Sequence, residues 1–155
     1  MSNWVISLSV GLFAPALFAA AWAMSASQTS DQAREVQSLK AVCAKCHNLQ
    51  IVMDTPKSYD AWHDTVQKMV DLGAKGTDGQ YDDIMDYLHR TMTTIDVNSA
   101  DPDELEIILN ASETAAQAIV ARRRTKKFTG LADLKSISGV DASIVDAKAR
   151  LIFFN

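Results

Sequence analysis

The run Cys43-Ala44-Lys45-Cys46-His47 constrains this chain more than any other segment. Two thiols at this spacing can form thioether bonds to the two vinyl groups of one porphyrin, and the adjacent imidazole can then bind the iron. Cys43 and Cys46 are the only cysteines in the sequence. The motif therefore predicts one covalently attached haem, with His47 as the proximal iron ligand.

The same residues have three alternative interpretations: a disulfide, a redox-active dithiol and half of a zinc site. A zinc site needs a second Cys or His pair at ligand spacing, whereas His63 and His89 are isolated in the sequence. A dithiol of the thioredoxin type needs a surrounding strand-helix-strand pattern, and the sequence has none. These absences favour haem attachment.

Residues 1–24 form an apolar stretch without a charged side chain, and an A-x-A cleavage site follows at Ala21-Trp22-Ala23. The stretch lacks the basic n-region of a signal peptide and approaches the ~20 residues that span a bilayer. We expect residues 1–27 to be a signal peptide or, alternatively, an uncleaved N-terminal anchor. Either one predicts a periplasmic protein, soluble or tethered to the inner membrane, with membrane contact only if the segment is uncleaved.

The next part of the chain, residues 28–94, predicts three helices and a thin core. The expected helices cover residues 31–45, about 58–72 and 81–91, separated by loops at 48–57 and around Gly73, Gly76 and Gly79. Ile84, Tyr87 and Leu88 are expected to point inward, and the acidic stretch 78–86 is expected to be a solvated helix face or, alternatively, a docking patch. So few helices bury little apolar surface. A covalently bound macrocycle would supply the missing interior.

Residues 34–92 resemble a small class I cytochrome c. The helix that ends in C-x-x-C-H, the terminal helix with Asp86-Tyr87-Leu88 and the stretch from Trp62 through Val66 to Met69 carry the resemblance. It implies that Met69 is the distal iron ligand and that Trp62 packs against haem c. Other distal ligands remain open, namely Met53, Met85, Met92 and, in a bis-histidine site, His63 or His89.

Residues 95–155 show a different pattern. Val97-Asn98 opens the segment, Pro102 suits a first helical turn, and Phe128-x-x-Leu131-x-Asp133-Leu134 precedes Ile137-Ser138-Gly139-Val140. We expect Asn98 to Ala100 to cap the helix that follows. The order resembles a tandem helix-hairpin-helix domain of the competence DNA-receptor type. The expected fold is therefore all-α: a cytochrome c domain (28–94) followed by a helix-hairpin-helix domain (95–155).

Departures from that family argue against DNA binding. DNA-binding hairpins use glycines so that backbone N–H groups can approach a phosphate, but the first hairpin here contains no glycine and Glu113 follows it. The second hairpin keeps Gly139 and has Asp141 where another glycine is expected. The segment is nearly neutral, with 8 basic and 9 acidic residues. Its one basic cluster fits phosphate contact or a solvated helix end: Arg122, Arg123, Arg124, Lys126 and Lys127.

Together these patterns predict an exported monohaem cytochrome that carries single electrons between redox proteins, with the second domain as a docking or structural module. A periplasmic dehydrogenase is one expected partner. No arrangement of nucleophile, paired acids or phosphate-binding loop indicates an enzyme. The alternatives are an exported DNA-binding protein with a haem domain and a peroxidase-like enzyme with an open iron site.

Overall fold

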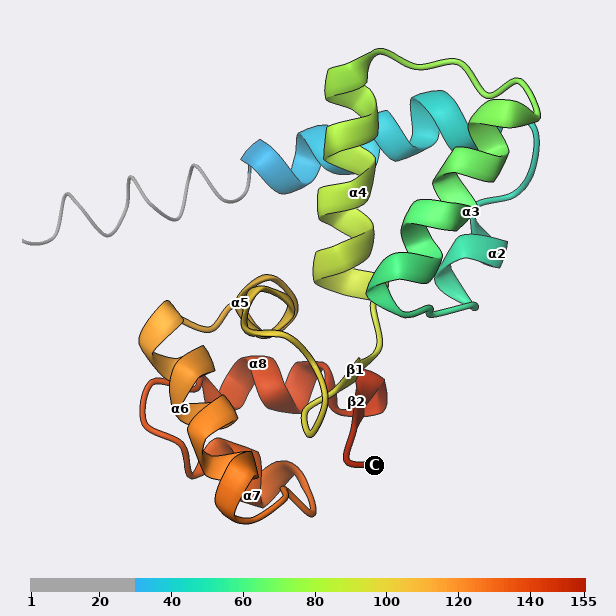
Figure 1. The fold of residues 1–155 in the computed structure, drawn as a ribbon. Helices are drawn as coiled ribbons and strands as arrows, with labels where there is room; N and C mark the ends of the chain where they lie inside the picture. The colour runs from blue at the N-terminus through green and yellow to red at the C-terminus, as the bar shows by residue number, and fades with distance from the viewer. Residues whose placement is uncertain (1–29) are drawn as a thin grey trace, which may run out of the picture. The chain divides into compact units, whose positions relative to one another are not determined.

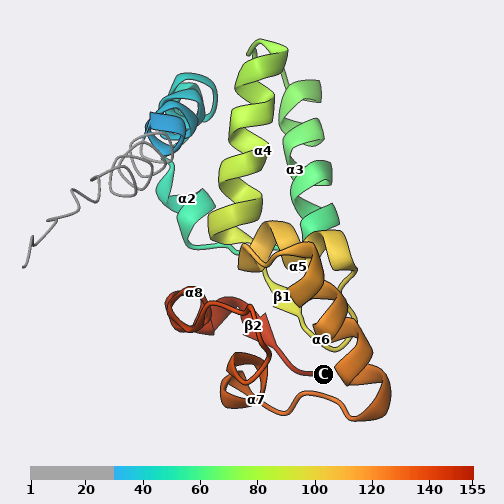
Figure 2. The same ribbon diagram turned by 90° about the vertical axis from the view of Figure 1, so that its left-hand side faces the viewer.

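The computed structural model describes residues 30–155 (Figures 1 and 2). The predicted leader, residues 1–27, lies outside the described residues. Gln32–Asn155 form one compact unit, and every labelled element belongs to it. No helix among the described residues is both long and apolar enough to cross a bilayer.

Residues 32–94, the first segment, contain three main helices. Residues 30–42 are helical and continue into the 3-10 turn Cys43–Lys45; α2 (Gln50–Met53), α3 (Tyr59–Asp71) and α4 (Asp78–Met92) follow. Figure 2 shows α3 and α4 side by side. The predicted inward residues of α4 are confirmed as buried, since Ile84, Tyr87 and Leu88 lie in a core with Trp62 and Leu39.

Two expected loops contain helical turns instead. Within residues 48–57, the short helix α2 forms, and the Asn48 side chain accepts a hydrogen bond from the N–H of its first residue, Gln50 (2.9 Å). Gly79 lies inside α4 rather than in the loop before it. The helix begins earlier than predicted because Thr77 and Gln80 form a capping box, each side chain bonding the other residue's backbone N–H.

The acidic face of α4 is not wholly solvated, contrary to the sequence-based expectation. Asp83 is buried and accepts hydrogen bonds from Ser38 Oγ (2.8 Å) and Arg34 Nε (2.9 Å). Buried Glu35 pairs with the Arg90 guanidinium. These contacts attach the helix of residues 30–42 to α4, and the bonds from Arg34 and Ser38 lower the pKa of Asp83.

Residues 95–155, the second segment, have their own core. The short strands β1 (Ile95–Asp96) and β2 (Ile152–Phe153) pair in parallel and bring the two ends of the segment together. Between them lie α5 (Pro102–Leu109), α6 (Glu113–Thr125), α7 (Leu131–Lys135), α8 (Ala142–Ala147) and the 3-10 turn Ala149–Leu151. Fully buried Leu105, Ile119, Phe128, Leu134 and Val145 form the centre of this core.

The predicted capping role of Asn98 to Ala100 is wrong. Asp101 is the N-cap of α5, its N–H bonds the Glu104 carboxylate (3.0 Å), and Pro102 occupies the first turn as expected. The Asn98 amide instead accepts from the Phe128 N–H (2.8 Å) and donates to the Phe128 carbonyl (2.9 Å). A side chain that pairs with both backbone groups of a distant residue ties the start of the segment to the loop between its two hairpins.

Several contacts join the two segments. Tyr59 of α3 packs against the core of the second segment. The Lys148 ammonium donates to the carbonyl oxygens of Arg90 and Ile108, in the last turns of α4 and α5. Burial, with the charge of Arg90 as a lesser cause, lowers the pKa of Lys148 to about 8.

The two remaining histidines differ in burial, since His63 is exposed and His89 is buried. His89 is 4 % exposed, and its ring stacks on that of Tyr59 with 3.9 Å between centroids. The His63 ring lies 5.1 Å away. Desolvation, helped by the charge of His63, lowers the pKa of His89 to about 4, and its Nε2 has no hydrogen-bond partner.

We therefore expect acid to destabilise the fold through His89. Between pH 6.5 and about 4 the unfolded chain binds a proton at this residue that the folded chain does not, so stability falls with falling pH. The slope is at most about 1.4 kcal/mol per pH unit. Urea unfolding at several pH values in this range gives the free energy of unfolding as a function of pH. This free energy should change less steeply with pH in His89→Gln than in the wild type. His63→Gln is the control and should keep most of the slope; equal slopes in all three proteins would contradict the assignment.

Candidate haem-binding site

Two adjoining cavities lie in the first segment, with volumes of about 210 Å³ and 360 Å³. Their walls are overwhelmingly apolar. The residues that line both cavities are Cys43, His47, Val66, Met69 and Ile84. Because the cavities share these residues, they form one site within the size range of cofactor pockets.

The two cysteines stand where the helix of residues 30–42 passes into its terminal 3-10 turn. Both thiols are free; Cys43 is half-buried and lines both cavities, and Cys46 is exposed and lines the smaller one. Burial raises the pKa of Cys43. A reactive redox thiolate needs a lowered pKa, so this environment does not favour the dithiol interpretation.

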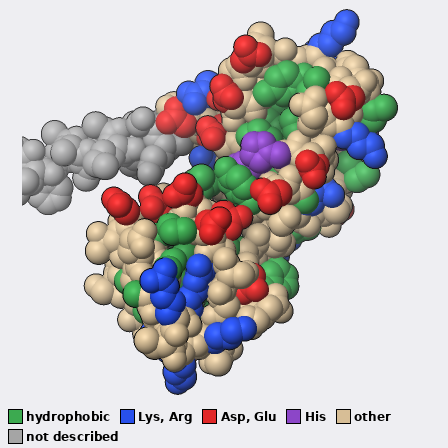
Figure 3. All heavy atoms as spheres, in the orientation of Figure 1, with side chains coloured by type: hydrophobic (Ala, Val, Ile, Leu, Met, Phe, Trp, Pro, Cys, Tyr) green, Lys and Arg blue, Asp and Glu red, His purple; other side chains and the backbone are tan. Residues whose placement is uncertain are grey.

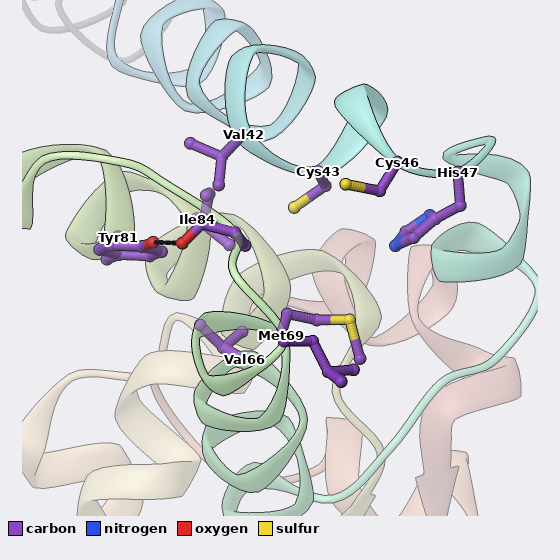
Figure 4. Close-up of a pocket in the computed structure, with 10 residues that line it drawn as sticks. Val42, Cys43, Cys46, His47, Val66, Met69, Tyr81 and Ile84 are labelled. Atoms are coloured by element: carbon purple, nitrogen blue, oxygen red, sulfur yellow. Dashed lines mark hydrogen bonds between the residues drawn. The ribbon is translucent and has the colours of Figure 1, made fainter.

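His47 follows the turn and faces the same space. Figure 4 shows its ring and the two sulfur atoms on one side of the site, with the Met69 side chain across from them. The Asn48 carbonyl oxygen lies 3.3 Å from His47 Nδ1 and accepts a hydrogen bond from the tautomer protonated there. That tautomer leaves Nε2 free to bind a metal, and the bond orients the ring.

Met69 lies on α3, two turns after Trp62, and lines both cavities. The other candidate ligands line neither one. The Met53 sulfur accepts a hydrogen bond from the Tyr87 hydroxyl (3.7 Å), and Met92 is buried in the core of the first segment. His63 and His89 lie with Tyr59, away from both cavity linings. The geometry therefore brings Met69 together with His47.

Trp62 forms part of the wall of the larger cavity. The residue is 2 % exposed, and its indole N–H donates to the Met92 carbonyl (3.0 Å), which fixes the ring between α3 and α4. At the smaller cavity, Gly76 closes the loop against Val42, since a Cβ at Gly76 would lie 2.9 Å from Val42 Cγ2. The Tyr81 hydroxyl bonds the Ala74 carbonyl (2.9 Å) and holds the same loop (Figure 4).

The residues present fit a covalently held haem. Two thiols, one imidazole and one thioether supply the attachment groups and axial ligands that the cofactor requires. Ile51 and Leu72 line the cavities yet are 62 % and 73 % exposed, which is unusual for such large apolar side chains. Among the described residues, no group of three or more His, Cys, Asp or Glu side chains could hold a metal ion.

In the second segment, the first hairpin joins α5 to α6 without glycine. Asn110 adopts the left-handed conformation (φ 50°) that a glycine would otherwise supply, and asparagine tolerates it better than most residues. Ser112 then caps α6 by accepting from the Ala115 N–H (3.2 Å). The left-handed turn therefore forms without glycine, and the Asn110 side chain lies at the turn position.

The second hairpin carries Gly139 and Asp141. Gly139 has φ +86°, and a Cβ there would approach Ala115 Cβ to 3.3 Å, so the residue permits both the turn and close packing on α6. The Asp141 carboxylate accepts hydrogen bonds from the Ser143 hydroxyl (2.6 Å) and the Ser143 N–H (2.8 Å). These bonds lower the pKa of Asp141. The Asp141 carboxylate thus occupies a backbone N–H at the start of α8.

Three of the five side chains in the basic cluster are engaged within the fold, including Lys127, whose ammonium donates to the Asn155 carbonyl (3.2 Å). Arg123 donates to the carbonyls of Val97 (3.0 Å) and Ala100 (2.6 Å). Arg122 pairs with Asp133 (3.3 Å) and lies over the Phe128 ring. Acidic side chains lie among the basic ones on the face that Figure 3 draws. The cluster is therefore largely structural.

Comparison with known proteins agrees with this part of the fold. Residues 91–152 match the family model of the helix-hairpin-helix motif. No curated protein and no solved structure shows a significant match to the chain.

Sequence reasoning missed several residues of the site. Ile51, Leu72 and Lys57 line the cavities, although none belongs to a motif. Of the three, Lys57 was the easiest to predict from the sequence, because it lies just before the helix that carries Trp62 and Met69. The positions of Ile51 and Leu72 depend on loop conformation, which apolar periodicity does not predict.

Proposed function

We propose that this protein is an exported monohaem c-type cytochrome that carries single electrons between redox proteins in the periplasm. The helix-hairpin-helix segment serves as a docking or structural module. One observation carries the proposal: the residues of the C-x-x-C-H motif and Met69 line one apolar site from opposite sides.

Each residue has a distinct role in this proposal. Haem supplies a single iron that accepts and returns one electron. Cys43 and Cys46 hold the cofactor covalently, while His47 and Met69 remain bound in both oxidation states. A thioether ligand and an apolar wall favour the reduced, less charged state, so the potential is raised. Exposed Cys46 marks the edge through which electrons enter and leave.

Two axial protein ligands leave no open position for a substrate, so the proposal assigns no enzymatic activity. The N-terminal apolar stretch supports export, because cytochromes of this type receive haem outside the cytoplasm in bacteria. The partners are redox proteins, of which a periplasmic dehydrogenase is one candidate. Binding of DNA by the second segment is the rival function, and the engaged polar groups of its hairpins argue against it.

The proposal predicts that denatured protein retains one haem by mass. After expression with export and a haem-maturation system, Cys43→Ser and Cys46→Ser should each lower covalent attachment, because each variant can form only one thioether bond. Ser138→Ala, a surface change in the second segment, is the control and should attach haem normally. A wild-type chain at its bare polypeptide mass would contradict the haem assignment.

Ligation by Met69 predicts a six-coordinate low-spin spectrum with the weak near-infrared band of sulfur-to-iron charge transfer. Met69→Ala should abolish this band because the thioether is lost. Met53→Ala and Met85→Ala are matched controls and should retain it, since neither residue lines the cavities. If a control variant loses the band and Met69→Ala keeps it, the assignment of Met69 as the distal ligand is wrong. Ready binding of carbon monoxide by the wild type would favour the open-site enzyme.

The second segment should bind duplex DNA weakly at most. We expect no binding tighter than about micromolar near physiological salt, and any weak binding should decline steeply as salt rises. A titration of the full chain measures this. Replacing Arg124, Lys126 and Lys127 by Gln should abolish residual binding, whereas Lys135→Gln is the single-charge control. Micromolar or tighter binding that survives the triple replacement would show that the hairpins bind phosphate, and the DNA-receptor function would replace the docking role.

A further inference from the structure

One charged side chain interrupts the apolar lining of the two cavities. Lys57 is the only Lys, Arg, Asp or Glu among the residues that line them. Thr55 and Thr65 lie in the same wall, and all three line the larger cavity alone. The one charged side chain of the two linings therefore lies in the larger cavity, whereas Cys46 lines only the smaller one.

The backbone of Lys57 is fixed and its charge is unpaired. Its N–H donates to the Met92 carbonyl (3.3 Å), and its carbonyl accepts from the Thr94 N–H (2.8 Å). Its ammonium lies 5.7 Å from the centroid of the Trp62 ring. Among the described residues it forms no ion pair, unlike Arg34, Arg90, Arg122 and Lys135. A half-buried cation beside an apolar cavity favours an anionic partner.

Haem carries such an anion at a defined place. Its vinyl groups are on two neighbouring pyrroles and its two propionates are on the other two, so thioether bonds at one end direct the carboxylates toward the opposite end. Cys46 marks the end at the smaller cavity. The propionates would then extend into the larger cavity, where Lys57 and the two threonines lie.

We infer that Lys57 binds a haem propionate and thereby raises the reduction potential of the site. This inference rests on the proposed function. Charge-assisted hydrogen bonding between an ammonium and a carboxylate is short and strong. Removing the cation would leave a negative charge near the iron, which stabilises the oxidised state. Lys57 is a positioning residue that acts through the propionate.

The test uses the haem-loaded full chain with Lys57→Gln and Lys57→Met, the second of which keeps an apolar stem against Trp62. The control is Lys75→Gln, which removes the same charge from an exposed residue outside both linings. Potentiometry should show a lower potential in both Lys57 variants. At a fixed applied potential, the ratio of oxidised to reduced protein should rise by up to about tenfold, equivalent to about 59 mV. The propionate bending band in the resonance Raman spectrum should shift in these variants alone.

Each outcome decides the inference separately from the proposed function. Lys57 variants with a normal haem spectrum but the potential and Raman band of Lys75→Gln would overturn the inference and leave the cytochrome intact. If neither variant retains haem, Lys57→Arg decides: loading by this variant supports a need for the cation, and failure to load indicates a packing role and overturns the inference. A wild type without haem would refute both proposals.

Discussion

An apolar cavity that the polypeptide does not fill determines the arrangement of residues 32–94. The helix of residues 30–42, α3 and α4 surround it, and the indole N–H of Trp62 bonds the Met92 carbonyl to fix two of its walls. Ile51 and Leu72 remain exposed at its edge. These three helices bury little apolar surface of their own, so the proposed haem would contribute to the stability of the fold as well as to its proposed chemistry.

Polar side chains of the second segment stabilise it by bonding to backbone groups of the chain. The Arg123 side chain donates hydrogen bonds to two backbone carbonyls, and the Asn98 side chain donates one to the Phe128 carbonyl. Lys148 bonds carbonyls at the ends of α4 and α5 and so joins the segments, at the cost of a half-buried charge. The Lys148 bond to Arg90 attaches the segment to residues 32–94, which is compatible with a docking or structural module.

Apolar periodicity predicted the main helices because it reflects burial directly: Ile84, Tyr87 and Leu88 recur at helical spacing and are buried. The motif residues came together with Met69 because Trp62, Val66 and Met69 share one face of α3. Side-chain partners were harder to predict. The burial of His89 depends on stacking against Tyr59, a residue distant in sequence, and Asn98 bonds a residue across the segment. No local pattern encodes such contacts.

Polar side chains bond backbone N–H groups within both hairpins. Asn110 reproduces the left-handed turn with a side chain in place of open backbone, so the chain path is unchanged. Asp141 goes further, because its carboxylate satisfies the Ser143 N–H and hydroxyl from within the chain. A phosphate at this hairpin would have to displace that carboxylate and approach its charge, a repulsion on the order of 1 kcal/mol at a wet surface. Internal satisfaction of these groups therefore stabilises the hairpin and disfavours the ligand through the same atoms.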